Sequence, residues 1–310
     1  MSIRFDDRVV IVTGSGHGLG KCHALEFARR GARVVVNDLG AGLDGSGGGS
    51  DAAQAVVAEI EAAGGEAITN GANVADYAQV ESMVSDTMDR WGRVDVLVNN
   101  AGILRDKTFG KMQLDDFKAV VDVHLHGSVN CTKAVWPHMV EQEYGRVVLT
   151  SSSSGIYGNF GQTNYAAAKM ALVGFMNALW LEGRKHNIKV NSLSPIAATR
   201  MTEGLIPEHI LAMLAPEAVT PAVVFMASEN APDRQIIAAG AGVYARVVIQ
   251  ETPGVFLPED QRDAEHIAQA WEQIASTDGQ VELMVGSEQT TKHIAKVAAS
   301  LGIELPEAAT

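Results

Sequence analysis

Residues 9–20 read VVIVTGSGHGLG, a short apolar run followed directly by a glycine-rich turn, and this stretch decides the fold. A helical pattern continues from the turn to about residue 30, and a second apolar run, VVV, follows at residues 34–36. The sequence therefore predicts a strand, a helix and a second strand, the unit from which parallel sheets are built.

The same alternation of strands and helices continues along most of the chain. Further strand-like runs lie at residues 67–69, 94–100, 146–150 and 188–193. Segments with helical periodicity lie between them, at about residues 52–63, 76–91, 114–138 and 162–186. We therefore expect an α/β protein whose doubly wound parallel sheet is covered by helices on both faces.

The pattern changes after about residue 250. The 310 residues, 46% of them hydrophobic, are enough for one large α/β domain, which we place at residues 1–250. A proline-containing bridge, ETPGVFLPED, then leads to two further helical patterns. Residues 251–310 are expected to form a mainly helical C-terminal extension, either a packed appendage or a subunit contact.

Charge and composition exclude several classes of partner. The net charge of −13 disfavours a protein that binds nucleic acid. No apolar run approaches the roughly 20 residues needed to span a bilayer, so we expect no membrane segment. The chain enters a strand too early to leave room for a signal peptide, which predicts a cytoplasmic protein. Neither CxxC nor HExxH occurs, so no metal site is expected.

Two glycine-rich segments compete as the phosphate-binding turn. A phosphate site needs a tight turn between a strand and a helix, where backbone N–H groups converge on the anion. Only residues 13–20 have that context, and there Gly14, Gly18 and Gly20 would allow a pyrophosphate to approach closely. The denser segment at residues 40–49 is expected to be a flexible loop that borders the adenine side and leads to an N-cap at Ser50.

Asp38 ends the second predicted strand, about 20 residues beyond the glycine turn. A carboxylate at this position accepts hydrogen bonds from an adenosine ribose and repels a 2′-phosphate. The sequence therefore predicts NAD rather than NADP as the cofactor. The alternative is that Asp38 only caps the end of the strand.

A candidate for proton transfer lies in the segment NYAAAK. Tyr165 and Lys169 are four residues apart and share one face of a helix. A neighbouring ammonium favours the ionised phenol, and the hydroxyls of SSSSG, at the carboxyl end of the preceding strand, could polarise a carbonyl. The alternative is a surface helix beside a serine-rich turn.

TGSGHGLG, NNAG, Ser152 and the Tyr-x-x-x-Lys pair, in this order, resemble the short-chain dehydrogenase/reductase family over roughly residues 5–250. The resemblance implies a Rossmann fold. It also implies that Tyr165 exchanges the hydroxyl proton, Ser152 holds the substrate oxygen, and Lys169 binds the nicotinamide ribose and lowers the pKa of the tyrosine. The cofactor-binding residues that it implies are Gly14, Gly18, Leu19, Gly20, Asp38, Asn73, Val74, Asn100, Ala101, Gly102, Tyr165, Lys169, Ala198 and Thr199.

The segments GILRDKTF, VHLHGS and YGRVVLTSSSSGIYGNFGQTNYAAAK are similar to one branch of this family, the (3R)-hydroxyacyl-CoA dehydrogenase part of peroxisomal multifunctional enzyme type 2. This resemblance implies NAD-dependent oxidation of 3-hydroxyacyl-CoA esters and a homodimer or homotetramer. The chain is too short to add a hydratase domain and ends in EAAT rather than a peroxisomal signal, so we expect a stand-alone cytoplasmic enzyme.

His124 stands where the wider family usually carries asparagine, and we include it among the candidate catalytic residues. A histidine can orient a water or relay a proton, and a purely structural role is an equal alternative. Arg105, Lys107 and Lys111 form a basic cluster that either contacts the phosphates of CoA or is solvated surface.

Three other functions stay open. The chain could act on 17β-hydroxysteroids or sterol side-chain CoA esters. It could be a ketoacyl-carrier-protein reductase that uses NADPH, against which Asp38 argues. It could also be a non-catalytic NAD-binding regulator, which the complete set of Ser152, Tyr165 and Lys169 disfavours.

Overall fold

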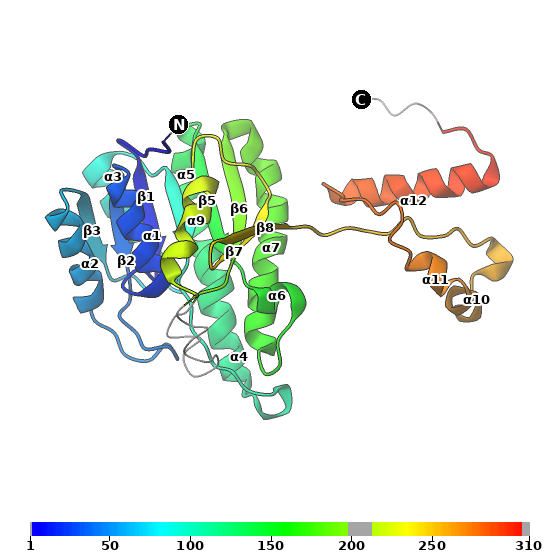
Figure 1. The fold of residues 1–310 in the computed structure, drawn as a ribbon, viewed down its shortest axis with the longest axis horizontal. Helices are drawn as coiled ribbons and strands as arrows, with labels where there is room; N and C mark the ends of the chain where they lie inside the picture. Colours follow the sequence, from blue (N-terminus) through cyan, green and yellow to red (C-terminus); the bar gives the residue numbers. More distant parts are fainter. Residues whose placement is uncertain (1, 198–212, 306–310) are drawn as a thin grey trace. The chain divides into compact units, whose positions relative to one another are not determined.

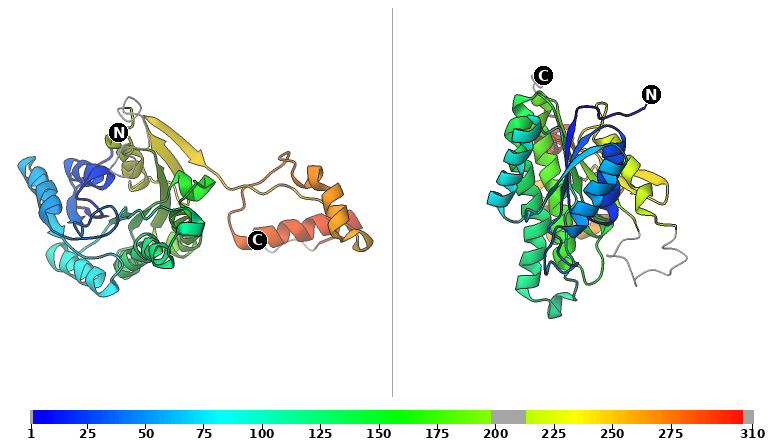
Figure 2. Two further views of the ribbon diagram at one scale, coloured as in Figure 1. Left: turned by 90° about the horizontal axis from the view of Figure 1, so that it is seen from below. Right: turned by 90° about the vertical axis from the view of Figure 1, so that its left-hand side faces the viewer.

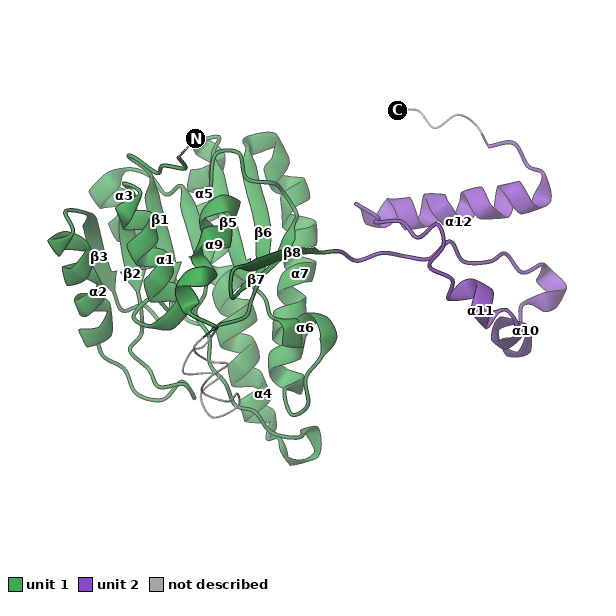
Figure 3. Ribbon diagram, viewed as in Figure 1, with its two compact units in different colours: residues 1–247 green, residues 248–310 purple. Residues whose placement is uncertain are grey.

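The structure, a computed structural model, describes residues 2–197 and 213–305. The chain divides into two compact units, Met1–Val247 and Val248–Thr310 (Figure 3). The first unit holds an eight-stranded sheet flanked by helices, the α/β architecture expected from the sequence. None of the helices within the described residues is long and apolar enough to cross a membrane.

The strands and helices of the first unit alternate along the chain (Figure 1). The strands are β1 (Val9–Thr13), β2 (Arg33–Asn37), β3 (Glu66–Asn70), β4 (Val96–Asn99), β5 (Gly145–Thr150), β6 (Ile188–Pro195), β7 (Ile236–Gly240) and β8 (Val243–Val247). The helices are α1 (Gly18–Arg29), α2 (Asp51–Ala62), α3 (Tyr77–Trp91), α4 (Leu114–Val121), α5 (Gly127–Glu141), α6 (Ser153–Tyr157), α7 (Thr163–Gly183) and α9 (Thr220–Met226).

The sheet has the strand order β3-β2-β1-β4-β5-β6-β7-β8, and its first seven strands are parallel. The chain reverses direction across the sheet between β1 and β4. Open α/β sheets bind ligands beyond the carboxyl ends of the strands at such a switch point. The topology therefore places the ligand crevice next to the glycine turn that follows β1.

The edge strand β8 departs from the predicted all-parallel sheet because it pairs antiparallel with β7. Only Ala241 and Gly242 separate the two strands, with φ of 50° and 75°. Two residues with positive φ form the kind of turn that suits the twist of a hairpin. The dipeptide AG does not mark a hairpin turn in the sequence, because alanine rarely adopts a positive φ.

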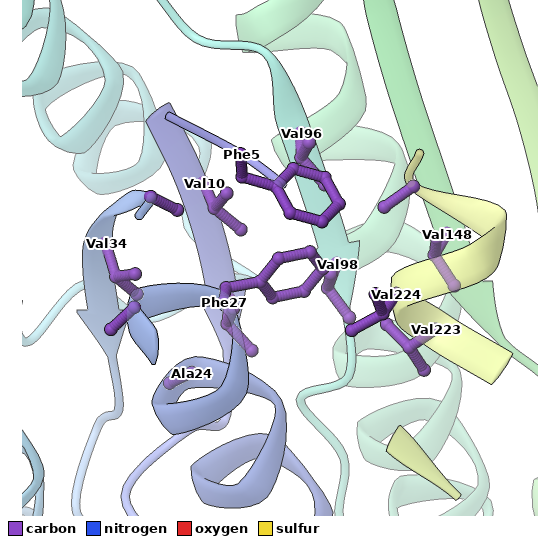
Figure 4. Packing of buried hydrophobic residues seen from close by; sticks show 14 of the residues in the cluster. Phe5, Val10, Ala24, Phe27, Val34, Val96, Val98, Val148, Val223 and Val224 are labelled. Carbon is purple, nitrogen blue, oxygen red and sulfur yellow. The ribbon is translucent and has the colours of Figure 1, made fainter. Parts of the chain in front are cut away.

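Helices cover both faces of the sheet, as the two views of Figure 2 show. On one face, α1 packs against α2 and α9, and on the other α3 packs against α5 and α4 against α7. The apolar strand residues divide between the two resulting core clusters. In the first cluster, Phe5 and Phe27 meet edge to face with ring centroids 4.9 Å apart, beside Val10 and Val98 (Figure 4).

The long helix expected at residues 114–138 is interrupted. A π-helical turn over Asp122–His126 separates α4 from α5. The hydroxyl of Ser128 donates to the His124 carbonyl at 2.7 Å, on the turn where the helical hydrogen bonding changes. Such turns are frequent at functional sites, and this one contains His124.

The second unit contains α10 (Ala264–Gln269), α11 (Trp271–Ile274) and α12 (Gly286–Leu301). Lys292 and Lys296 of α12 donate to the carbonyls of Thr252 and Gly254, which fastens the helix to the start of this unit. Its regular elements within the described residues are helices, which agrees with the C-terminal helices expected from the sequence.

Candidate active site

The glycine turn lies between β1 and α1, as predicted. Gly14 has a φ of 62°, and a Cβ added there would lie 2.7 Å from the Cα of Ala101, so the position requires glycine. The side-chain amide of Asn100 donates to the carbonyls of Thr13 and Gly14, both at 2.9 Å. Asn100 therefore supports the backbone of the turn while it also lines the cavity beside it.

Asp38 follows β2 and faces the same turn. One carboxylate oxygen accepts the Gly16 N–H and the other accepts the Gly40 N–H, both at 2.7 Å. Asp38 thus places a negative charge between the glycine turn and the start of the loop at residues 39–50. The contact of this carboxylate with an adenosine ribose stays a prediction.

Ser152 follows β5 and is buried at the N-terminus of α6. Its hydroxyl oxygen accepts the N–H of Ser154 at 3.2 Å. It also forms a hydrogen bond with Tyr165 that lowers the pKa of this phenol. The structure therefore brings the predicted serine and tyrosine together.

Lys169 lies one helical turn after Tyr165 on α7, with its ammonium 5.5 Å from the centre of the phenol ring. It donates to the carbonyl of Thr150 at 2.5 Å, and its side chain is only 3% exposed. Burial lowers the pKa of Lys169 to about 7, because few groups replace the solvation of its charge.

The sequence predicts that Lys169 lowers the pKa of Tyr165. This prediction is wrong for the protein without a bound cofactor. Burial raises the pKa above its usual value, the hydrogen bond with Ser152 lowers it, and the nearby carboxylate of Asp106 raises it. The prediction rested on the Lys169 ammonium four residues along the helix. In the structure, burial removes hydration from the phenolate, and this effect outweighs the hydrogen bond with Ser152.

His124 lies beneath the tyrosine, with the two rings edge to face and their centroids 5.1 Å apart. Its Nε2 lies 2.8 Å from the carbonyl oxygen of Ile103 and 3.1 Å from the Ile103 nitrogen. Burial and the charge of Lys169 hold its pKa well below the usual value, so the ring is neutral. Its Nδ1 is buried and makes no hydrogen bond with any residue in the described part of the chain.

These residues surround a single cavity of about 750 Å³. All the candidate site residues that the structure describes line it: Gly14, Gly18, Leu19, Gly20, Asp38, Asn73, Val74, Asn100, Ala101, Gly102, His124, Ser152, Tyr165 and Lys169. Ala198 and Thr199 lie outside the described residues. Within residues 2–197 and 213–305, no group of histidine, cysteine, aspartate and glutamate side chains could hold a metal ion.

Several cavity residues were not singled out from the sequence. Gln162 accepts the Ser154 hydroxyl at 2.8 Å and the Asn159 amide at 3.0 Å, and it donates to Asp106 at 2.5 Å. Of these residues, Ser154, Asn159 and Gln162 line the cavity near Ser152. The segment GNFGQTNY, which the sequence analysis used only for the resemblance, carried this signal as a cluster of amides before the tyrosine.

The loop at residues 39–50 borders the cavity, as predicted, but Ser50 does not cap α2. Its backbone is helical and its hydroxyl accepts the Gln54 amide at 2.8 Å instead of a helix N–H. In the basic cluster, Arg105 and Lys107 both lie 3.4 Å from the carboxylate of Asp116. Their charges are therefore partly balanced within the protein.

The cavity fits a dinucleotide. Its volume is in the range of small-molecule sites, and a glycine turn and a carboxylate flank one part of it. At the other part, Thr150 Oγ1 and His124 Nδ1 are buried polar atoms with no hydrogen-bond partner among the described residues. Buried polar atoms require a partner, which a bound ligand or water would supply.

The doubly wound sheet, the glycine turn and the adjacent Ser152, Tyr165 and Lys169 define a dehydrogenase that acts on CH–OH groups. The family described as short chain dehydrogenase matches residues 8–209. The chain belongs to this family.

Similar proteins include "Peroxisomal multifunctional enzyme A" of Dictyostelium discoideum, 46% identical over 279 residues, which cover 90% of this chain and 62% of that protein. The structure of full-length peroxisomal multifunctional enzyme type 2 from Drosophila melanogaster matches with a TM-score of 0.80 and 36% identity, over 96% of this chain and 51% of that one. The chain therefore spans about half to two thirds of these relatives.

A 7α-hydroxysteroid dehydrogenase, complexed with NADH and 7-oxo glycochenodeoxycholic acid, matches with a TM-score of 0.70 and 28% identity, over 77% of this chain and 95% of that one.

Proposed function

We propose that this chain oxidises (3R)-3-hydroxyacyl-CoA esters to 3-ketoacyl-CoA with NAD. The observation that carries the proposal is one cavity that has Asp38 beside the glycine turn and Ser152, Tyr165 and Lys169 around its other part. The similarity to peroxisomal multifunctional enzymes supports the acyl-CoA substrate.

In this mechanism, Ser152 donates a hydrogen bond to the substrate oxygen and orients the hydroxyl toward Tyr165. The phenolate of Tyr165 accepts the hydroxyl proton, and NAD supplies the acceptor for the hydride that leaves the same carbon. Lys169 would bind the ribose of a bound cofactor, and the phenolate beside it would favour the protonated lysine, whose charge in turn stabilises the phenolate. His124 would use its Nδ1, which has no hydrogen-bond partner among the described residues, to hold a water next to Lys169, through which the proton leaves.

The test of this function is the initial rate of NADH formation with NAD and (3R)-hydroxyacyl-CoA esters of several chain lengths. We expect turnover of the (3R) esters, at least about 100 times slower turnover of the (3S) epimers, and little activity with NADP. The wild-type rate with 17β-estradiol and with 3-ketoacyl thioesters plus NADPH is measured in parallel. Activity with only the steroid or only NADPH would contradict the proposal.

A steroid substrate is the second candidate, because the fold matches a 7α-hydroxysteroid dehydrogenase whose structure contains NADH. The same panel separates it from the acyl-CoA function. If NAD binds and no substrate reacts, the non-catalytic regulator becomes the better interpretation.

Asp38 gives a separate prediction for the cofactor. In Asp38→Ser, the ribose loses its acceptor and the repulsion of a 2′-phosphate disappears, so the ratio of kcat/KM for NAD to that for NADP should fall about a hundredfold. Asp51→Asn removes an acidic group at the start of α2 and should leave the ratio unchanged. An unchanged ratio in Asp38→Ser would mean that Asp38 only orders the loop.

We also propose a cytoplasmic homodimer or homotetramer. Leu114 of α4 and Met170 and Leu181 of α7 expose apolar side chains that contact with a second copy would bury.

A further inference from the structure

The loop between β2 and α2, residues 39–50, is a closed loop whose two ends touch. We call it the strap. It lies at the same end of the sheet as α6 (Figure 1). The Gly49 N–H donates to the Leu39 carbonyl at 3.0 Å, and Gly40, with a φ of 71°, approaches the Gly49 backbone too closely for any side chain. Compact surface loops with adjacent ends are frequently functional.

The middle of the strap is held in shape by Asp44. Its carboxylate accepts the Ser46 N–H at 3.0 Å and the Ser46 hydroxyl at 2.7 Å, and the Gly42 N–H donates to the Ser46 carbonyl at 2.7 Å. The strap therefore carries hydrogen bonds of its own between its two ends and across its middle.

The strap covers the dinucleotide part of the cavity. Leu39, Ala41, Gly42, Leu43 and Gly45 line it together with the glycine turn and Asp38. Near the start of the strap, the Gly40 N–H donates a hydrogen bond to the Asp38 carboxylate at 2.7 Å. A cofactor bound between the glycine turn and Asp38 would consequently lie against the strap.

Two hydrogen bonds fasten the strap to the opposite wall of the cavity, the segment after β4. The Leu104 N–H donates to the Leu43 carbonyl at 2.9 Å, and the Arg105 Nε donates to the Asp44 carbonyl at 2.9 Å. Arg105 also pairs with Asp116 of α4 at 3.4 Å, which fixes its guanidinium in place. Of these two hydrogen bonds, only the one from Arg105 is donated by a side chain.

We propose that Arg105 is a positioning residue for the cofactor: it holds the strap against the dinucleotide and thereby sets the rate at which the cofactor leaves. This proposal rests on the proposed NAD-dependent function. Because the strap bridges the two walls of the cavity, the Arg105 bond must break each time the strap opens. The backbone bond between Leu104 and Leu43 remains, so loss of Arg105 weakens the closed state without abolishing it.

The test is the rate of NADH release from the full chain without substrate, followed by stopped-flow fluorescence. Arg105→Met should speed release about fivefold to tenfold and weaken NADH affinity to the same degree, because one charge-assisted hydrogen bond is lost. Asp44→Ala, which loosens the middle of the strap and leaves Arg105 in place, should change release in the same direction.

Lys107→Met is the matched control, since it removes the other cation that pairs with Asp116 and makes no bond to the strap. Its NADH release rate should equal that of the wild type. Equal acceleration in Lys107→Met would show a general charge effect and overturn the proposal.

Unchanged release in Arg105→Met would also overturn it. So would a higher KM for the CoA ester with unchanged release, because Arg105 would then contact the substrate. If the wild type binds no NADH, the proposed function fails, and the strap proposal fails with it.

Discussion

Tyr165→Phe should reduce kcat for alcohol oxidation about a thousandfold while the affinity for NADH changes less than twofold. The substitution removes only the phenolic oxygen, which is the proposed acceptor of the hydroxyl proton, and general base catalysis contributes a factor of this size. The ring keeps its edge-to-face contact with His124 and its place above Lys169, so the cavity should retain its shape. Initial rates and a fluorescence titration with NADH measure the two quantities.

The pH profile adds a second readout for Tyr165. Burial raises the pKa of the phenol, so kcat/KM for oxidation in the wild type should rise with pH as the phenolate forms. The residual activity of Tyr165→Phe should lack this rise. Tyr157→Phe, which alters a tyrosine that is 74% exposed on α6, is the control and should behave like the wild type. Retention of most of the activity in Tyr165→Phe would exclude this residue as the base.

The parallel sheet and the glycine turn could be predicted, because both depend on local sequence patterns. The alternation of short apolar runs and helical segments defined the parallel sheet, and the glycines after β1 marked the turn because tight backbone approach tolerates no side chain. The hairpin of β7 and β8 was missed because Ala241 takes a positive φ, a conformation that alanine rarely adopts.

That Tyr165 and Lys169 line one cavity could also be predicted, since they need only helical spacing to share one face. The pKa values of these residues could not be predicted from the sequence. The pKa of Tyr165 depends on burial by elements distant in sequence and on the carboxylate of Asp106. The role of Arg105 was hidden for a similar reason, because its acceptor is a backbone carbonyl of a loop far away in the sequence.

Lys169→Met should remove most of the activity, about a hundredfold or more, and at the same time raise the melting temperature at neutral pH. The activity falls because the proposed stabilisation of the phenolate and the ribose contact are lost. The stability rises because methionine fills a similar volume without bringing a charge into the interior. In the wild type, burial lowers the pKa of this lysine from 10.5 to about 7, which is a cost to the folded state.

The pH dependence of this gain has a defined sign. Between pH 7 and pH 10.5 the unfolded wild type binds the lysine proton and the folded protein does not, so wild-type stability from this group increases with pH. The advantage of Lys169→Met should therefore be largest below pH 7, on the order of 5 °C, and vanish near pH 10. Lys169→Met also loses the hydrogen bond to the Thr150 carbonyl, which reduces the gain in stability by the same amount at every pH below 7.

Thermal unfolding of Lys169→Met, wild type and Lys133→Met at pH 6.5, 8 and 10 measures this difference, with the exposed Lys133 of α5 as the control for charge removal. A melting temperature that falls equally at all three pH values would mean that Lys169 stabilises the fold through its hydrogen bond and packing alone. A gain in melting temperature that decreases as the pH rises, together with lost turnover, would mean that the ammonium next to Tyr165 lowers the stability of the fold and is needed for activity. The same buried charge would then account for both a cost to folding and the activity of the site.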